Sequence, residues 1–158
     1  MNIDSRELRD ALGQFSTGVC LVTAAGDEGV AYALTINSFA SVSLDPPLVL
    51  WSLQKDAEIF PVYANAATYC IAVLAASQEA HSTAYAQKGG HRLSDSDYEL
   101  GTNGAPLIKN ALVNFECSLE QSLDGGDHII LLGRVTRVSE IEAQAPLVFF
   151  GGEYRELQ

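Results

Sequence analysis

The sequence predicts a mainly β protein with peripheral helices, in which an antiparallel sheet closes on itself. Segments with the alternating or continuous apolar pattern of strands outnumber segments with helical spacing. These strand-like segments come in runs separated by turns, instead of alternating strictly with helices. Such runs favour an antiparallel sheet over a doubly wound parallel one. The chain has 158 residues without an internal repeat or a linker, so we expect a single domain over residues 1–158.

The first predicted element is a helix over residues 4–15. Asp4 can cap it, and Glu7 stands three residues later, as in a capping box. Apolar residues recur with helical spacing on one face, namely Leu8, Ala11, Leu12 and Phe15.

Strands with clear turn signals follow this helix. A β-branched, apolar run predicts a strand at 19–23, a glycine-rich turn occupies 26–29, and the next strand is expected at 30–39. Pro46-Pro47 cannot donate hydrogen bonds to a sheet and marks a corner. A buried strand over 48–53 comes after it.

Two further helices are expected. Residues 56–67 have a helical pattern, in which Pro61 limits where the first turn can begin. Ser77 can cap a helix that runs to about Lys88, where Gly89-Gly90 ends it.

The second half of the chain is expected to consist mainly of strands. They are predicted at 68–74, 113–120, 128–138 and 146–150. Residues 89–106 are rich in Gly, Ser, Asp and Asn and predict a long loop, and Asp124-Gly125-Gly126-Asp127 predicts a tight turn.

Composition excludes several classes of function. A net charge of -11 disfavours nucleic-acid binding, because an acidic surface repels phosphate backbones. No stretch approaches the ~20 apolar residues of a membrane span. The N-terminus lacks a signal-peptide pattern, so we expect a cytoplasmic protein. Cys20, Cys70 and Cys117 lie far apart in apolar runs, which predicts buried thiols in a reducing compartment and no metal site.

Motifs along nearly the whole chain resemble the flavin reductase-like family. The matching segments, in the family's order, are Phe15-Ser16-Thr17-Gly18-Val19, Val22-Thr23, Leu34-Thr35-Ile36-Asn37-Ser38-Phe39, Ser41-Val42-Ser43-Leu44-Asp45-Pro46-Pro47-Leu48-Val49, Ala72-Val73-Leu74, Gly104-Ala105-Pro106-Leu107, Gly125-Gly126-Asp127-His128-Ile129-Ile130, Pro146-Leu147-Val148-Phe149 and Gly152-Glu153-Tyr154. The resemblance implies a split β-barrel of the FMN-binding type with Greek-key antiparallel strands. It also implies a homodimer with flavin near the subunit interface, NADH or NADPH as reductant, and a separate flavin-dependent monooxygenase that receives the reduced flavin.

Reduction of a flavin requires little chemistry from the protein, because the two cofactors exchange the hydride once their rings are stacked. No catalytic triad is therefore expected. The resemblance suggests that short side chains along one strand bind the flavin ring: Leu34, Thr35, Asn37, Ser38 and Ser41. The alternative is that these residues form the polar outer face of a sheet.

The flavin phosphate requires hydrogen-bond donors or a positive charge. Lys55 is the only lysine or arginine between residues 11 and 87, and it precedes a predicted helix. The expected phosphate-end residues are Ser52, Leu53, Gln54, Lys55 and Ala57, and the alternative for Lys55 is a solvated lysine. The chain departs from the family in having Asp56-Ala57-Glu58 where hydroxyls are common, and Ala84-Tyr85 where an Arg-Phe pair is common. Added carboxylates should weaken flavin binding.

The resemblance places His128 beside the nicotinamide and the flavin, with Tyr85 and Tyr154 as further cofactor contacts. The alternative for His128 is a strand-end histidine bonded to Asp127 or to a backbone carbonyl. Tyr154 is otherwise an ordinary surface tyrosine. His91 and Arg92 could reach a phosphate, although a solvated loop is favoured for them.

We therefore expect an NAD(P)H:flavin oxidoreductase that supplies reduced FMN or FAD to a partner monooxygenase. One alternative is a flavoprotein on the same barrel with a substrate of its own. Another is a non-catalytic flavin-binding module. No GxGxxG motif is present, so the nicotinamide is not expected to bind through a Rossmann unit.

Overall fold

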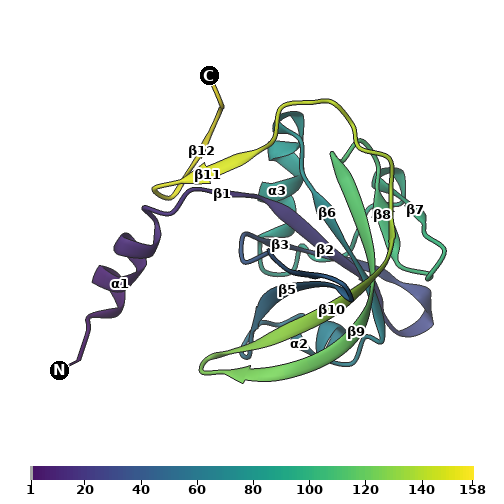
Figure 1. The fold of residues 1–158 in the computed structure, drawn as a ribbon, viewed down its shortest axis with the longest axis horizontal. Helices are drawn as coiled ribbons and strands as arrows, with labels where there is room; N and C mark the ends of the chain where they lie inside the picture. The colour runs from purple at the N-terminus through teal and green to yellow at the C-terminus, as the bar shows by residue number, and fades with distance from the viewer. Residues whose placement is uncertain (1) are drawn as a thin grey trace.

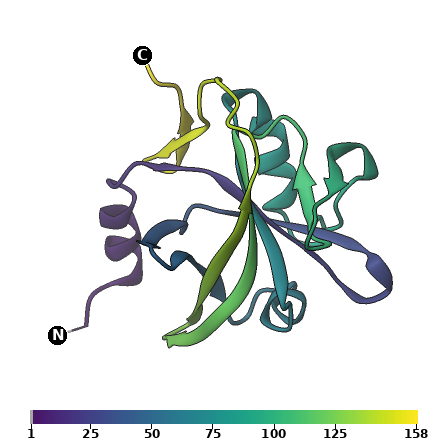
Figure 2. The same cartoon turned by 45° about the vertical axis from the view of Figure 1, so that its right-hand side comes forward.

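A seven-stranded antiparallel sheet dominates the computed structural model, which describes residues 2–158 (Figure 1). Its strands, in spatial order, are β3 (Ala31–Ile36), β2 (Cys20–Ala25), β6 (Thr68–Val73), β9 (Val113–Gly125), β10 (His128–Val138), β5 (Pro47–Gln54) and β4 (Ala40–Leu44). Every neighbouring pair is antiparallel. The edge strands β3 and β4 are consecutive in the chain, so the sheet returns on itself (Figure 2). The predicted mainly β, antiparallel fold is confirmed.

The remaining elements are short and lie around this sheet. They are α1 (Ser5–Leu12), α2 (Phe60–Ala64), α3 (Glu79–Tyr85), the 3₁₀ turns η1 (Asp27–Gly29), η2 (Ala76–Gln78) and η3 (Asp95–Asp97), the β7 (Tyr98–Leu100) and β8 (Pro106–Ile108) pair, and the small sheet of β1 (Thr17–Gly18), β11 (Val148–Phe150) and β12 (Glu153–Arg155). The sequence did not predict separate strands at β1, β4, β7, β8 or β12.

Both helices predicted after the Pro-Pro corner are shorter than expected. The helix predicted over 56–67 occupies only α2, because it begins where Pro61 can stand in the first turn. Ser77 does not cap a helix but lies inside η2. The Gln78 side chain fixes this turn by accepting from Ala75 N at 3.0 Å and donating to Lys109 O at 2.8 Å.

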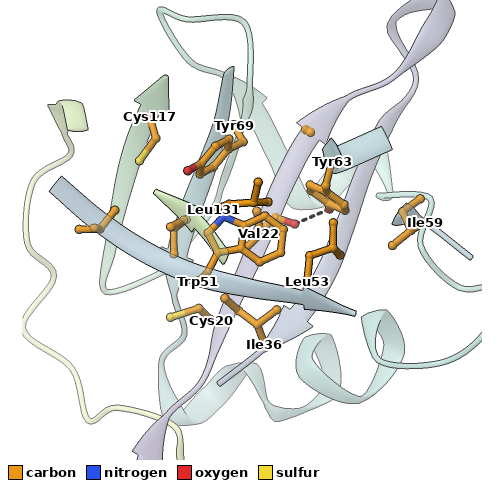
Figure 3. Close-up of a cluster of buried hydrophobic side chains, with 13 residues drawn as sticks. Cys20, Val22, Ile36, Trp51, Leu53, Ile59, Tyr63, Tyr69, Cys117 and Leu131 are labelled. Atoms are coloured by element: carbon orange, nitrogen blue, oxygen red, sulfur yellow. Dashed lines mark hydrogen bonds between the residues drawn. The ribbon is translucent and has the colours of Figure 1, made fainter. Parts of the chain in front are cut away.

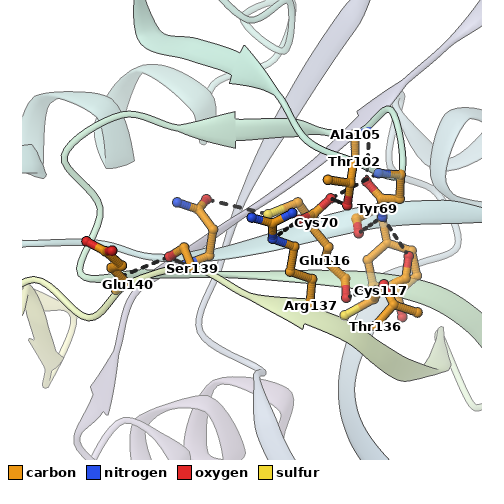
Figure 4. Close-up of polar contacts among 12 residues, drawn as sticks. Tyr69, Cys70, Thr102, Ala105, Glu116, Cys117, Thr136, Arg137, Ser139 and Glu140 are labelled. Carbon is orange, nitrogen blue, oxygen red and sulfur yellow. Dashed lines mark hydrogen bonds and ion pairs between the residues drawn. The ribbon is translucent and has the colours of Figure 1, made fainter.

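The predicted long loop over 89–106 is partly wrong, since it contains β7 and leads into the paired strand β8. A buried carboxylate on β9 holds the connection between them (Figure 4). Glu116 accepts hydrogen bonds from Thr102 Oγ1 at 2.9 Å and from Asn103 N at 3.0 Å. Arg137 Nε lies 3.7 Å from the other carboxylate oxygen. These long-range contacts order a segment whose composition is that of a loop.

The inner face of the sheet packs around Trp51, which is fully buried (Figure 3). Its ring meets Tyr63 edge-on at 5.4 Å and Tyr69 at 5.9 Å. Tyr63 also donates a hydrogen bond to Val22 O at 2.6 Å. A second cluster lies on the outer face of β2, β3 and β6, beneath α3. The two faces of these strands are therefore both buried.

All three cysteines are free thiols within the core. Burial raises the pKa of the Cys20 thiol to about 12 and that of Cys117 to about 12. The predicted burial of the three thiols is confirmed.

Helix α1 projects away from the barrel (Figure 1). Asp4 caps it by accepting from Arg6 N at 2.8 Å and from Glu7 N at 3.1 Å, as predicted. The expected apolar face, however, packs on nothing in the described chain, since Leu12 is 66% and Phe15 is 80% exposed. A backbone bond from Gly151 N to Gly13 O tethers the end of the helix.

Candidate functional site

A cavity of about 220 Å³ lies where β3 and β5 end and β10 begins. Its lining residues are Leu34, Thr35, Ile36, Asn37, Ser38, Ser52, Gln54, Ala57 and His128. His128 pairs with Gln54 across the ladder between β10 and β5, which brings two residues far apart in sequence to the same wall. All of the lining residues except Ile36 are among those the sequence predicted for the site. The side chain of Ile36 belongs to the core, and no sequence signal marks it.

Two of the predicted ring-binding hydroxyls already have partners in the protein. Thr35 Oγ1 donates to Ser82 O at 2.7 Å, which fixes the end of β3 against α3. Ser38 Oγ accepts from Ser52 N at 3.0 Å and lies 3.4 Å from Ser52 O. Asn37 is exposed and has no hydrogen-bond partner within residues 2–158. Its amide is therefore the polar group of this row that is most available to a ligand.

His128 lines the cavity and is also bonded to its neighbour. Its Nδ1 lies 2.7 Å from Asp127 Oδ1, and its side chain is 39% exposed. The hydrogen bond from His128 lowers the pKa of Asp127, so that the carboxylate is ionised near neutral pH. An ionised Asp127 must accept, which places a proton on Nδ1 and leaves Nε2 for a ligand. The bond to Asp127 is the one that the alternative interpretation of His128 expected, and the same ring also lines the cavity.

Lys55 stands between the cavity-lining residues Gln54 and Ala57, but its side chain does not line the cavity. Its Nζ lies 2.5 Å from Asp124 Oδ1, and its backbone N donates to Asp127 O at 2.9 Å. The ion pair lowers the pKa of Asp124. The Lys55 ammonium is therefore paired with Asp124 instead of being free in solvent.

Several other predicted residues lie outside the cavity. Leu53 points into the core and can offer a ligand only its backbone. Ser41 is exposed on β4 and does not line the cavity. Tyr85 is buried and donates to Asp97 Oδ2 at 2.7 Å, and burial raises its pKa. The Tyr154 hydroxyl lies 2.6 Å from Ser82 Oγ, and Ser82 O in turn accepts from the cavity residue Thr35. Tyr154 is therefore connected to the cavity only through Ser82.

The segment around His91 is not the solvated loop that the sequence favoured. His91 is buried, and its Nδ1 lies 3.2 Å from Ala33 O. The backbone groups of this segment bond to β3, because Ala33 N donates to His91 O at 2.8 Å. Arg92 remains exposed. Glu58 is also engaged here, since its carboxylate accepts from Gly89 N at 2.8 Å.

A larger groove of about 530 Å³ adjoins the cavity and shares Asn37 with it. The end of α1, Thr17, Phe149 and the Gly151-Gly152 turn form its walls. Sequence reasoning missed this groove, because it forms where the two ends of the chain meet and neither end has a local signal for it.

Two structural findings concern other classes of protein. Within residues 2–158, the structure contains no cluster of three or more His, Cys, Asp or Glu side chains suited to holding a metal ion. None of the helices in that range combines the length and apolar character needed to cross a bilayer.

Residues 12–158 match the sequence profile of the flavin reductase like domain. The chain belongs to the flavin reductase-like family. This match covers every residue that lines the cavity.

Relatives of this flavin reductase-like chain have closely related sequences and structures. The FMN reductase (NADH) SmoA of Agrobacterium fabrum is 43% identical over 151 residues, which cover 96% of this chain and 85% of SmoA. The flavin-dependent monooxygenase reductase subunit HsaB of Rhodococcus jostii is 35% identical, over 99% of this chain and 80% of HsaB. The Streptomyces globisporus NADH:FAD oxidoreductase SgcE6, solved with NAD and FAD fragments, superposes with a TM-score of 0.90 at 37% identity, covering 100% of this chain and 97% of that one.

Proposed function

We propose that this protein is an NADH:flavin oxidoreductase that reduces FMN or FAD and releases the reduced flavin to a separate monooxygenase. The observation that carries the proposal is the cavity that gathers Asn37, the Ser38–Ser52 pair and His128 in a chain of this family. The names of SmoA, HsaB and SgcE6 support the reductant, the flavin and the partner class.

The cavity residues fit a flavin ring. An isoalloxazine edge has both donors and acceptors, and the Asn37 amide offers both without a competing partner in the described chain. The open groove beside Asn37 gives room for a ligand longer than the cavity. A bound flavin would supply the atom that accepts the hydride from nicotinamide, and one proton from solvent would complete the reduced flavin.

The residues of this chain contribute by holding and orienting the two cofactors. The Ser38–Ser52 and Thr35–Ser82 hydrogen bonds hold the strand ends that form the wall of the cavity. Asp127 orients the His128 ring, so that Nε2 is available to accept a hydrogen bond from the nicotinamide carboxamide. Holding two rings in contact is the principal catalytic contribution that such a site can make.

The direct test is NADH and NADPH oxidation by the purified protein with added FMN, FAD or riboflavin. We expect turnover that depends on added flavin, and faster turnover with NADH, because the cavity wall has no arginine to bind a 2′-phosphate. Flavin binding without turnover would favour a flavoprotein with its own substrate or a binding module. Absence of both would reject a flavin ligand.

Asn37→Leu is expected to raise the flavin Kd by about five- to tenfold, since one to two hydrogen bonds to the ring are lost. The measurement is a fluorescence titration of the flavin. Ser41→Ala serves as a control, because Ser41 lies outside the cavity. An unchanged Kd for Asn37→Leu would place the ring elsewhere.

We further propose that the protein is a homodimer whose interface covers α1. An isolated helix of eight residues is only marginally stable in water, and the apolar face of α1 has no cover in the described chain. Leu44 on β4 is 97% exposed and supplies a second apolar group near a sheet edge. Large exposed apolar groups on two elements indicate a surface that a second copy buries.

The double substitution Leu12→Gln with Phe15→Gln is expected to weaken the dimer by about tenfold or more in Kd. Size-exclusion chromatography with light scattering measures the mass over a dilution series. Arg6→Gln on the same helix is the control, because the Arg6 side chain is exposed and polar. A wild-type monomer, or a double variant with the wild-type mass at every dilution, would contradict this interface.

The expected single domain and cytoplasmic location stay proposals. Strands β2, β3 and β6 contribute to both hydrophobic clusters, which supports one cooperative unit. Three free, buried thiols and a requirement for NADH suit a reducing compartment.

A further inference from the structure

The turn between β9 and β10 provides an acidic partner for each of the two basic side chains at this end of the cavity. Asp124 pairs with the Lys55 ammonium, and Asp127 bonds the His128 ring. Asp124 lies near the end of β9, and Asp127 lies in the turn that follows, where Gly126 adopts the positive φ that the turn requires. The tip of the β9–β10 hairpin therefore holds the acidic partners of both Lys55 and His128.

Lys55 is well placed for a ligand that binds in the cavity. It lies between Gln54 and Ala57, which both line the wall, and its backbone N is fixed by Asp127 O. Its side chain is 43% exposed and that of Asp124 is 80% exposed, so the pair can open at small cost. The neighbouring Asp56 is exposed and acidic, so Lys55 is the basic residue of this segment.

We propose that Asp124 competes with the flavin phosphate for Lys55 and thereby sets how readily the flavin is released. This inference rests on the proposed flavin reductase function and concerns the phosphate end of the same site. When flavin binds, the phosphate dianion with its several acceptor oxygens takes the ammonium from Asp124. When reduced flavin leaves, Asp124 pairs with the Lys55 ammonium again. This pairing lowers the free-energy cost of releasing the flavin. A reductase that must hand its product to another protein gains from such weakened retention.

The test compares FMN with riboflavin, which lacks the phosphate, by fluorescence titration and by stopped-flow release. Asp124→Asn is expected to lower the FMN Kd by roughly three- to fivefold at low salt and to slow FMN release, with riboflavin unchanged. High salt should reduce the difference, because both partners are exposed. Asp27→Asn, in the exposed turn at the far end of the β2–β3 hairpin, removes the same charge as a control for the overall field.

A second variant separates competition from simple repulsion. Lys55→Met should weaken FMN binding, and in the Lys55→Met background Asp124→Asn should no longer tighten it. Any of three results would overturn the competition while flavin-dependent NADH oxidation still stands. They are that Asp124→Asn tightens FMN binding equally with and without Lys55, that it tightens riboflavin binding as much as FMN binding, or that it leaves FMN affinity unchanged. A wild-type protein that neither binds flavin nor oxidises NADH with it would instead reject the proposed function and the inference with it.

Discussion

Replacing His128 with alanine is expected to lower the rate of NADH oxidation by about 10- to 100-fold, with flavin affinity nearly unchanged. The ring lines the cavity, and its Nδ1 is held by Asp127 at 2.7 Å. Loss of the ring removes the group that orients the nicotinamide, whereas Asn37 and the Ser38–Ser52 pair still form the flavin wall. Steady-state kinetics with varied NADH and a separate flavin titration measure the two effects.

Asp127→Asn is the companion variant, because it tests position without removing the ring. An asparagine can present either an acceptor or a donor to Nδ1, so the preferred tautomer is no longer imposed. We expect an intermediate loss of rate, with a larger change in kcat than in the flavin Kd. Wild-type turnover in His128→Ala would exclude the histidine from the reaction.

Gly133→Ala is expected to destabilise the fold by about 2–3 kcal/mol, because the added methyl group would overpack the core. Gly133 is buried on β10, between β5 and β9. A Cβ at this position would meet the hydroxyl oxygen of Tyr69, as well as Cys117 Cβ at 3.4 Å. Tyr69 is itself buried and packed edge-on against Trp51, so it has little freedom to move aside. Urea denaturation of the two proteins measures the difference.

Tyr69→Phe tests the same contact from the other side. The Tyr69 hydroxyl is buried and has no hydrogen-bond partner within residues 2–158, so its removal should be neutral or stabilising. The double variant should therefore lose less stability than Gly133→Ala alone, because the hydroxyl oxygen is gone and the nearest remaining atoms are the ring carbon at 3.1 Å and Cys117 Cβ at 3.4 Å. A full loss in the double variant would assign the strain to the backbone of β10.

Much of the candidate site could be predicted because it is nearly continuous in sequence. Leu34, Thr35, Asn37 and Ser38 follow one another at the end of β3, and Ser52 and Gln54 end β5. Alternation along a strand and the Pro-Pro corner are local signals, and they located these strands to within a few residues. The resemblance to flavin reductases added His128, which no periodicity would single out.

The predictions that went wrong depended on partners distant in sequence. The segment around His91 was expected to be a solvated loop, but His91 is buried and its Nδ1 lies 3.2 Å from Ala33 O on β3. The 89–106 segment has a loop composition, yet Glu116 and β8 order it. Ser77 has the chemistry of a cap, but Gln78 fixes that turn through Ala75 and Lys109. Local composition does not report which long-range hydrogen bonds a segment will find.

The sequence by itself determined most strands of the main sheet, the tight turns, the capped first helix and the polar row, because backbone preferences and side-chain alternation act over a few residues. Only the tertiary structure decided which charges meet and which faces stay open. Lys55 and Asp124 pair across the meeting of β5 with the β9–β10 turn, and that contact exists only in one strand register. The tertiary structure likewise decided that the apolar face of α1 is exposed, because α1 projects away from the barrel. The same apolar pattern on a helix packed against the barrel would belong to the core.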